Sequence, residues 1–190
     1  MEKIWKIIEE DLNRVMPLIT NFIKNKKILD VGCGSGLSAK FIAKKVPCQI
    51  SLLDIEDLRN NKAKIFPFTL GSAENLPFKN NSFDIIYIQF VLHHLQINPV
   101  NVLKEAYRVA RYNTIIIEEI ITDEIEIKKA MEKDQEKNDL LNLHSSYPIQ
   151  KFFWEEELQE MIMNSNWRIK KEYTLFNDGY PPVKIYILSK

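Results

Sequence analysis

The sequence contains few cysteines, no long apolar run and no excess of charge of either sign. Cys33 and Cys48 are too few for a disulfide framework or a cysteine-based metal cluster, and we expect no metal site. No apolar stretch approaches the roughly 20 residues that a membrane-spanning helix needs. The N-terminal segment MEKIWKIIEEDL mixes charged with apolar residues and lacks the apolar core of a signal peptide. These absences predict a cytoplasmic protein with reduced thiols.

The charge balance argues against a nucleic acid as partner. Lys plus Arg and Asp plus Glu number 26 each, whereas proteins that contact many phosphates usually carry a basic excess. The lysines at 24, 26 and 27 form only a small basic patch. A chain of 190 residues with 45% hydrophobic residues can bury a sizeable core. We therefore predict one domain over residues 1–190, present as a monomer or a homodimer.

Short apolar runs alternate with helical patterns through most of the chain. The expected strands are Lys27–Val31, Gln49–Leu53, Lys64–Thr69, Phe83–Ile88 and Thr114–Ile117. Helical periodicity lies between them, at Leu37–Lys45 and in a segment that starts at Asn98-Pro99. This alternation predicts an α/β fold whose parallel sheet is covered by helices on both faces.

The two ends of the chain depart from this alternation. Residues 1–25 have helical spacing, and Pro17 is expected to end one helix and open another. Residues 120–153 form a variable segment whose first part is polar and is expected to be helical or partly mobile. A helix at Glu155–Asn164 follows. The last expected strands, Trp167–Leu175 and Val183–Leu188, are joined through the turn signal Asn177-Asp178-Gly179 and form an antiparallel pair.

A glycine-rich loop follows the first strand. The sequence ILDVGCGSG ends at Gly36, and Cys33 lies within the loop, where a small side chain suffices for packing. Glycines let the backbone turn tightly and approach a ligand, while the next helix presents free N–H groups. Asp54 ends the following strand, where a carboxylate can accept hydrogen bonds from a ribose. This order predicts a nucleoside-containing ligand; the alternative is a tight connection without a ligand.

Several motifs together resemble one family. LDVGCGSG (Leu29–Gly36), LLDIE around Asp54, the segment Gly71–Leu95 and the later NVLKEAYRVA…TIIIEE resemble class I S-adenosylmethionine-dependent methyltransferases. The similarity is to the small-molecule branch that includes ubiquinone/menaquinone-type enzymes (methyltransferase type 11), and it spans about residues 27–119. The resemblance implies a Rossmann-like three-layer sandwich. Its seven-stranded sheet would be mostly parallel, with an antiparallel C-terminal strand pair.

The resemblance also implies which residues bind S-adenosyl-L-methionine and its product S-adenosyl-L-homocysteine. Asp30 and Gly32 would face the methionine end of the cofactor, while Gly34 and Gly36 would shape the loop around Cys33. Asp54 would bind the ribose hydroxyls. The remaining expected contacts are Ile55 on the adenine face, Ser72 and Ala73 at its edge, Glu74 as a substitute hydrogen-bonding group, and Gln89 beside the sulfonium.

Three positions depart from the family pattern. Ser72 stands where an Asp is common, and Gln89 replaces a residue that is commonly smaller. The usual Pro-Gly-Gly before the fifth strand is absent, and 111–113 (Arg-Tyr-Asn) are expected to fill that turn. None of these departures affects the loop itself, so the expected cofactor is unchanged.

Candidate catalytic groups follow the fourth and fifth strands. His93 and His94 are possible general bases, with His94 favoured, because imidazole titrates near neutral pH; packing is the alternative. Of Glu118 and Glu119, one is expected to point into the pocket and the other to solvent, with a structural role for both as the alternative. Glu119 is retained as a catalytic candidate. His144 and Tyr147 in the variable segment are candidates for an acceptor lid. Trp5 would either close over the cofactor or pack in the core.

The predicted function is methyl transfer to an oxygen, nitrogen or carbon atom of a small organic acceptor. The alternatives are a cofactor-binding protein without transferase activity, a nicotinamide-dependent oxidoreductase, and a methyltransferase for RNA or protein. The loop spacing G-x-G-x-G, rather than G-x-G-x-x-G, disfavours a nicotinamide cofactor. No N/D-P-P-Y/F motif follows the fourth strand, where residues 88–91 are Ile-Gln-Phe-Val, which argues against the N-methyltransferases that use it.

Overall fold

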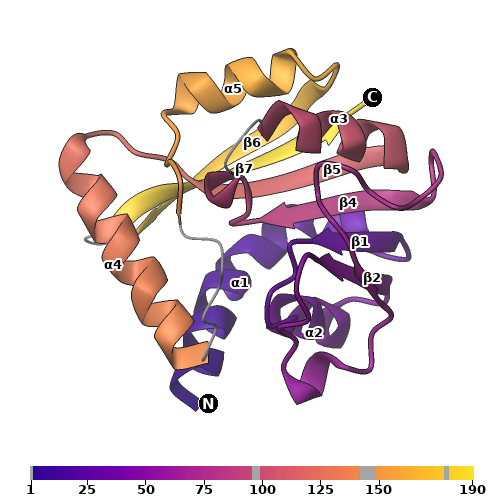
Figure 1. Cartoon of the computed structure of the whole chain (residues 1–190), viewed down its shortest axis with the longest axis horizontal. Helices are drawn as coiled ribbons and strands as arrows, with labels where there is room; N and C mark the ends of the chain where they lie inside the picture. The colour runs from indigo at the N-terminus through magenta and orange to yellow at the C-terminus, as the bar shows by residue number, and fades with distance from the viewer. Residues whose placement is uncertain (1, 96–98, 142–148, 178–179) are drawn as a thin grey trace.

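The computed structural model describes residues 2–95, 99–141, 149–177 and 180–190. Seven strands form one sheet in the order β3-β2-β1-β4-β5-β7-β6 (Figure 1). The parallel strands are β1 (Lys27–Val31), β2 (Gln49–Asp54), β3 (Phe68–Leu70), β4 (Phe83–Gln89) and β5 (Ala110–Glu119). β7 (Tyr180–Ser189) is antiparallel to both β5 and β6 (Arg168–Asn177). The fold class predicted from the sequence is confirmed.

Helices cover both faces of the sheet, which makes three layers. The helices α1 (Glu2–Ile23) and α2 (Leu37–Lys45) pack on one face, and α3 (Pro99–Val109) and α5 (Glu155–Met163) on the other. α4 (Glu124–Leu141) contacts α1 and β7 and lies beside the end of the sheet toward which β4 points (Figure 1). Short 3₁₀ turns occur at Asn61–Ala63 and Leu92–His94. No helix in the described ranges is long and apolar enough to cross a bilayer.

The central strands are buried on both faces because alternate side chains enter different core clusters. On β4, Ile86 and Ile88 pack with α3 and α5, whereas Ile85 and Tyr87 pack with α1 and α2. A strand buried in this way is almost continuously apolar, as parallel strands usually are. The unbroken apolar runs therefore predicted these strands well.

The N-terminal segment forms one helix rather than two, so the expected break at Pro17 is wrong. Pro17 lies inside α1 and is exposed. Val15, Met16 and Ile19 belong to one buried face that continues past the proline. Packing of this continuous face holds the helix together despite the backbone hydrogen bond that proline cannot donate.

Two strands differ in length from the expectation. β3 begins at Phe68 rather than at Lys64, because the chain before it turns at Asn61–Ala63 and buries Ala63. β5 begins at Ala110, directly after α3, so the turn expected at residues 111–113 does not form. Asn113 instead pairs with Ile85 of β4, with a register shift at the start of the pairing.

The other elements lie close to their expected positions. α2, α3, α5 and the antiparallel β6–β7 pair form as predicted, and residues 178–179 of the expected turn lie outside the described residues. Much of the variable segment is the single helix α4. β1 and β4 are neighbours, and the chain continues from them toward opposite edges of the sheet. In open α/β sheets, ligands bind at the carboxyl ends of the strands at such a switch point.

Candidate functional site

A cavity of about 520 Å³ lies at the carboxyl ends of β1, β2 and β4. Its size is in the usual range for sites that hold small ligands. The wall comes from the glycine loop, from the segments after β2, β3 and β4, and from α1 and α4. The lining includes most of the predicted cofactor residues, namely Asp30, Gly32, Cys33, Gly34, Asp54, Ile55, Ser72, Ala73, Glu74 and Gln89, together with His94.

The three loop glycines have positive φ angles but different surroundings. Gly32 has φ 70°, and a Cβ there would lie 2.5 Å from Val91 Cγ2. Gly34 has φ 48°, and a Cβ there would meet nothing within 4 Å. Gly36 has φ 68°, does not line the cavity, and would clash with Ala63 Cβ at 2.6 Å. Gly34 therefore leaves space in the cavity, whereas Gly36 allows the loop to pack.

Asp54 connects the end of β2 to this loop. Its Oδ2 accepts a hydrogen bond from the Gly34 N–H at 2.7 Å, and its Oδ1 accepts one from the Ile55 N–H at 2.7 Å. Burial raises the pKa of the Asp54 carboxyl, although these two hydrogen bonds act in the opposite direction. Each carboxylate oxygen has a second lone pair, so the group can still accept hydrogen bonds from a ligand in the cavity.

Asp30, near the end of β1, is the most deeply buried acid of the cavity. Its side chain is only 4% exposed, and no described residue offers a hydrogen bond to its Oδ2. Burial, with a smaller contribution from the charge of Asp54, raises the pKa of Asp30 to about 7. A buried acid without a partner is costly unless a ligand supplies the missing donor. Asp30 is therefore placed to bind a cationic or N–H-bearing group.

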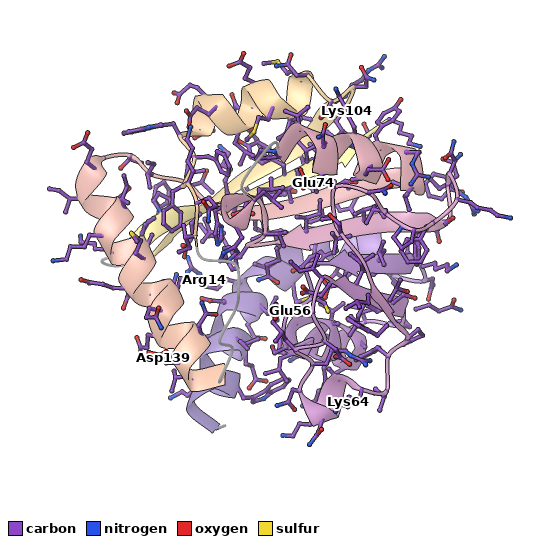
Figure 2. All side chains as sticks on the ribbon, in the orientation of Figure 1. Arg14, Glu56, Lys64, Glu74, Lys104 and Asp139 are labelled. Atoms are coloured by element: carbon purple, nitrogen blue, oxygen red, sulfur yellow. The ribbon has the colours of Figure 1, made fainter. Side chains whose placement is uncertain are left out.

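The cavity as a whole is acidic. Six carboxyl groups line it and, among the described lining residues, no Lys or Arg does. Glu56 follows β2 and Glu74 follows β3, and Figure 2 marks the positions of both. The other four are Asp11, Asp30, Asp54 and Asp134. This environment favours a cationic ligand and disfavours a phosphate-bearing one.

Two of the expected cofactor residues are fixed by local hydrogen bonds. Ser72 Oγ accepts a hydrogen bond from the Glu74 N–H at 3.2 Å, which shapes the loop after β3. Gln89 Oε1 accepts one from the Tyr87 hydroxyl at 2.9 Å. Both side chains border the cavity, and the Tyr87 contact sets the orientation of the Gln89 amide.

The two histidines occupy different positions in the 3₁₀ turn after β4. His94 borders the cavity, whereas His93 is 2% exposed and does not. His93 Nδ1 lies 2.8 Å from Glu118 Oε2, and Glu118 Oε1 accepts hydrogen bonds from Val91 N and Leu92 N. Burial alone would lower the pKa of His93, but the charge and hydrogen bond of Glu118 outweigh it and the pKa is raised. Glu118 thus orients both the turn and the imidazole.

The structure favours the alternative of a structural role for the two glutamates of β5, and the expectation that one points into the pocket and the other to solvent is wrong. Both Glu118 and Glu119 are buried, and neither lines the cavity or faces solvent. Glu119 accepts a hydrogen bond from Lys133 Nζ of α4 at 2.9 Å. The strand continues to Glu119, where β7 pairs with it and α4 supplies the cation, so Glu119 stabilises the contact between elements. It is not positioned as a catalytic group.

Other candidates fall outside the cavity or outside the described residues. Trp5 packs on Phe41 of α2 with ring centroids 6.3 Å apart and does not line the cavity, which favours the core alternative. His144 and Tyr147 lie outside the described residues. A Tyr-x-x-x-Lys spacing, which would suit a nicotinamide oxidoreductase, occurs three times, at Tyr147 and Lys151, Tyr180 and Lys184, and Tyr186 and Lys190. Tyr147 lies outside the described residues, and the other five residues do not line the cavity.

Sequence reasoning missed several residues of the cavity wall. The most informative are Asp11 on α1, Phe90 directly after β4, and Asp134 and Asn138 on α4. Phe90 has φ 56°, a strained backbone for an aromatic residue, and such strain is common at functional sites. An aromatic residue gives no sequence signal for a positive φ. The acids of α1 and α4 lie in charged helical stretches that look like ordinary solvated surface.

Comparison with known proteins agrees with this geometry. Residues 29–117 match the family model described as a methyltransferase domain. A ubiquinone/menaquinone biosynthesis C-methyltransferase of Rickettsia felis is 35% identical over 127 residues, which are 58% of this chain and 47% of that protein. The chain thus spans about half the length of the curated relatives that it matches.

Solved structures extend the likeness in fold to nearly the whole chain. A methyltransferase of Methanosarcina mazei superimposes with a TM-score of 0.71 at 19% identity, covering 92% of this chain and 97% of the other. The magnesium protoporphyrin IX methyltransferase of Synechocystis, with bound S-adenosylhomocysteine, superimposes with a TM-score of 0.71 at 13% identity. The match covers 99% of this chain and 86% of the other. At these identities the likeness concerns the fold alone.

Fold, loop and family match together indicate what this chain is similar to. Its Rossmann-like α/β fold is like that of the solved methyltransferase structures, and residues 29–117 are similar to the methyltransferase domain family. The resemblance to small-molecule methyltransferases of the ubiquinone/menaquinone type is confirmed, and its family match covers the strand–loop–helix core at residues 29–117.

Proposed function

We propose that this protein transfers a methyl group from S-adenosyl-L-methionine to a small organic acceptor. One observation carries the proposal: the glycine loop opens onto an acidic cavity in which the buried Asp30 has an oxygen without a hydrogen-bond partner. S-adenosylmethionine has a sulfonium and an ammonium group, and its demethylated product keeps the ammonium. An acidic cavity suits these cations, whereas it repels the pyrophosphate of a nicotinamide dinucleotide.

The chain's own residues fit the parts of this cofactor. Asp30 would accept hydrogen bonds from the ammonium, and the open space above Gly34 would admit the ligand next to the loop backbone. Asp54 would bind the ribose hydroxyls while it holds the Gly34 N–H. Ile55 and the backbone of Ala73 would contact the adenine. Each assignment is a proposal that rests on the position of the residue at the cavity.

The acceptor would lie on the side of the cavity formed by Gln89, His94 and α4. When bound, S-adenosylmethionine supplies an activated methyl group on sulfur. The protein then mainly has to hold the acceptor in line with that group, and alignment alone can lower a barrier by roughly 7–11 kcal/mol at best. A base is needed only for a protonated nucleophile, and His94 is the candidate at the cavity.

The acceptor is proposed only as a small molecule, methylated at oxygen, nitrogen or carbon. A cavity of about 520 Å³ suits a small ligand rather than a macromolecule. The relative from Rickettsia is named for C-methylation in quinone biosynthesis, and the Synechocystis structure for a magnesium porphyrin. These names differ in acceptor, so they support no single acceptor here.

Binding and turnover test the proposal in two steps. Calorimetric titration of the purified chain should detect S-adenosylhomocysteine and S-adenosylmethionine but not NADH. Transfer of a labelled methyl group to a panel of phenols, amines and carbon acids should then identify an acceptor. Binding with a uniformly blank panel would favour the alternative, a cofactor-binding protein without transferase activity. Absence of binding by well-folded protein would overturn the proposal.

His94→Ala tests the base role within this scheme. A ring that only removes a proton contributes about 10²–10⁴-fold to turnover, so turnover should fall by that factor while cofactor affinity stays nearly unchanged. Equal loss of turnover and of cofactor affinity would instead indicate that His94 shapes the cofactor pocket.

A further inference from the structure

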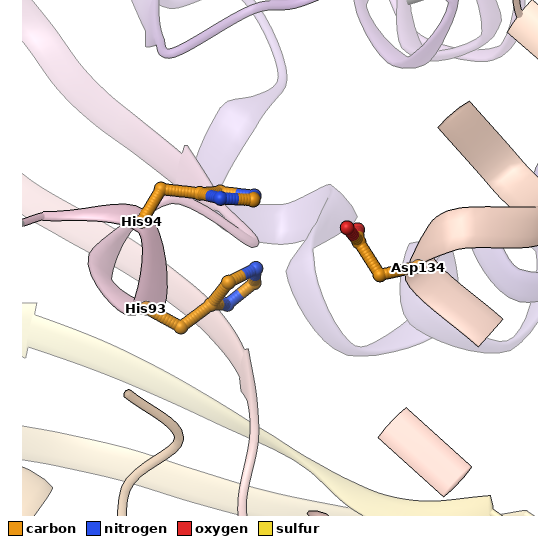
Figure 3. A group of neighbouring side chains, drawn as sticks. All are labelled: His93, His94 and Asp134. Carbon is orange, nitrogen blue, oxygen red and sulfur yellow. The ribbon is translucent and has the colours of Figure 1, made fainter. Parts of the chain in front are cut away.

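Two imidazoles and a carboxylate meet beside the cavity. His93 and His94 lie in the 3₁₀ turn after β4, and Asp134 lies on α4, so residues distant in the sequence are brought together by the fold. Each residue offers one ligand atom, and these three atoms lie within 4.8 Å of one another. Figure 3 shows both rings and the carboxylate directed toward the space between them.

In contrast to the expectation from the sequence that there is no metal site, we propose that His93, His94 and Asp134 bind a divalent metal ion, with Zn²⁺ as the reference ion. Two histidines and one carboxylate are a common ligand set for zinc sites that keep a position open for water or substrate. Bonds of about 2.0–2.2 Å place tetrahedral ligands roughly 3.4 Å apart, so the side chains would have to approach by about 1.4 Å or less. Side-chain rotation and a small movement of α4 can supply that approach.

The surroundings of His93 resemble those of a metal-bound histidine. A histidine that binds a metal usually gives its other ring N–H to a carboxylate, which fixes the tautomer and the ring orientation. His93 Nδ1 makes this contact with Glu118 Oε2 at 2.8 Å, so Nε2 is the nitrogen left for an ion. Phe152 lies against the ring with centroids 5.3 Å apart. The ring is therefore held in place before any ion binds.

Asp134 is oriented in a comparable way. Its Oδ2 accepts a hydrogen bond from Asn138 Nδ2 at 2.8 Å, one turn further along α4. Asp134, Asn138 and His94 also border the cavity, so the open positions of an ion would face the space proposed for the acceptor. The acidic lining favours any cation there.

This position suggests a chemical class for the acceptor, an inference that rests on the proposed function. An ion with an open position binds an oxygen donor such as a phenol, enol or carboxylate and lowers the pKa of a bound hydroxyl. With an ion present, His94 acts as its ligand rather than as the base. The metal site itself does not depend on this role, because its binding can be measured without cofactor or acceptor.

Titration with ZnCl₂ tests the site in metal-stripped protein. The Cys48→Ser background removes the partly exposed thiol, which could bind zinc adventitiously. We expect calorimetry to give one zinc ion per chain. The visible absorption spectrum of the protein with Co²⁺ in place of zinc should show the bands of a cobalt ion bound by nitrogen and oxygen atoms, without a charge-transfer band from sulfur. Absence of stoichiometric binding, or a cobalt–sulfur band, would overturn the proposal.

Variants locate the ligands. His94→Gln and Asp134→Asn should each lower zinc affinity at least about tenfold, and unchanged affinity in both would overturn the proposal. The matched control is Asp139→Asn on the same helix, because Asp139 is exposed and does not line the cavity (Figure 2). That variant should bind zinc like the parent.

Glu118→Gln tests the orientation of His93 with almost no change in shape. A glutamine oxygen can still accept the Val91 and Leu92 N–H groups, but its amide donates to His93 Nδ1 and moves the ring proton to Nε2. Zinc affinity should fall about 10–100-fold. If this variant does not fold, His94→Gln and Asp134→Asn decide the question alone. S-adenosylhomocysteine titration of the same proteins separates a failed metal site from a failed cofactor site.

Discussion

At the scale of single residues, Asp54 offers the most direct test of the cofactor site. Asp54→Ala should weaken S-adenosylhomocysteine binding by about 1–3 kcal/mol, because ribose hydroxyls would lose their acceptor. The change also leaves the Gly34 and Ile55 N–H groups without their present acceptor. Calorimetry measures the loss, with the exposed Asp139→Ala as control. An affinity equal to that of the parent would contradict the placement of this carboxylate.

Asp30 should make cofactor binding depend on pH. The pKa of Asp30 is raised to about 7, so a proton must leave this carboxyl before it can bind an ammonium group. Affinity for S-adenosylhomocysteine should therefore rise with pH up to about 7 and level off above it. The slope below pH 7 should approach about tenfold per pH unit, since one pKa unit corresponds to 1.36 kcal/mol. Calorimetry at several pH values would show a flat profile if Asp30 were not involved.

The same residue should have the opposite effect on the stability of the protein without ligand. The pKa of Asp30 in the folded protein lies above the usual aspartate value of 3.8, so stability falls as pH rises from about 4 to about 7. Asp30→Asn removes this loss and should raise the melting temperature at pH 8 while it weakens cofactor binding. Thermal denaturation at pH 5 and pH 8 measures the difference, and a lower melting temperature for the variant at pH 8 would contradict the argument.

The loop glycines should separate binding from stability. Gly34→Ala places its Cβ in open space, so the free energy of unfolding should fall only by the roughly 1–2 kcal/mol that a non-glycine residue costs in the left-handed conformation. Ligand affinity should fall as well, because the methyl group lies in the cavity. Gly36→Ala adds a clash at 2.6 Å with Ala63 and should destabilise the fold more. Denaturant titration and calorimetry of the two variants compare these effects. Equal stability of both would contradict the packing role of Gly36.

The sequence indicated the cavity residues next to the glycine loop better than those that α4 contributes to the cavity wall. Asp30 and Asp54 lie near the carboxyl ends of the buried strands β1 and β2, and Gly32 directly follows β1. The carboxyl ends of adjacent parallel strands must meet at one edge of the sheet. Asp134 reaches the cavity only because α4 packs on α1 and β7, and its helix has no clear apolar stripe to reveal that packing. Glu119 was misplaced for a related reason, because its partner Lys133 comes from the same helix.

At the scale of elements, α1 is the clearest difference from the prediction. Local propensity favoured a break at Pro17, but tertiary packing kept the helix continuous. The bounds of β3 and β5 show the same limit, since β3 begins only after the turn at Asn61–Ala63 and β5 begins directly after α3. Long apolar runs such as β4 were predictable because a strand that is buried on both faces needs apolar side chains at nearly every position.

Pro17→Ala should stabilise the protein. Pro17 is exposed, so the change removes little packing and restores one helical backbone hydrogen bond. A gain of about 1–2 kcal/mol is expected, smaller than the roughly 3 kcal/mol penalty of an interior proline because the unfolded chain becomes more flexible. The melting temperature should rise by about 2–4 °C per kcal/mol. A decrease would mean that proline stabilises the native helix at this position.

At the scale of the whole molecule, the cavity joins elements from separate parts of the chain. Its floor comes from the carboxyl ends of β1, β2 and β4. Its walls include residues of the helices α1 and α4, which lie outside the sheet. A ligand that contacts floor and walls together should therefore stabilise the native state as a unit. This stabilisation is independent of whether an acceptor is known.

S-adenosylhomocysteine should raise the melting temperature of the whole chain, whereas NADH should not. A ligand at about 100 times its dissociation constant contributes about 2.7 kcal/mol, which corresponds to roughly 5–11 °C for a chain of this size. Gly34→Val, which fills ligand space next to the loop, should melt at the same temperature with and without the ligand. A comparable shift with NADH would favour the dinucleotide alternative, because the acidic cavity would then have tolerated a pyrophosphate.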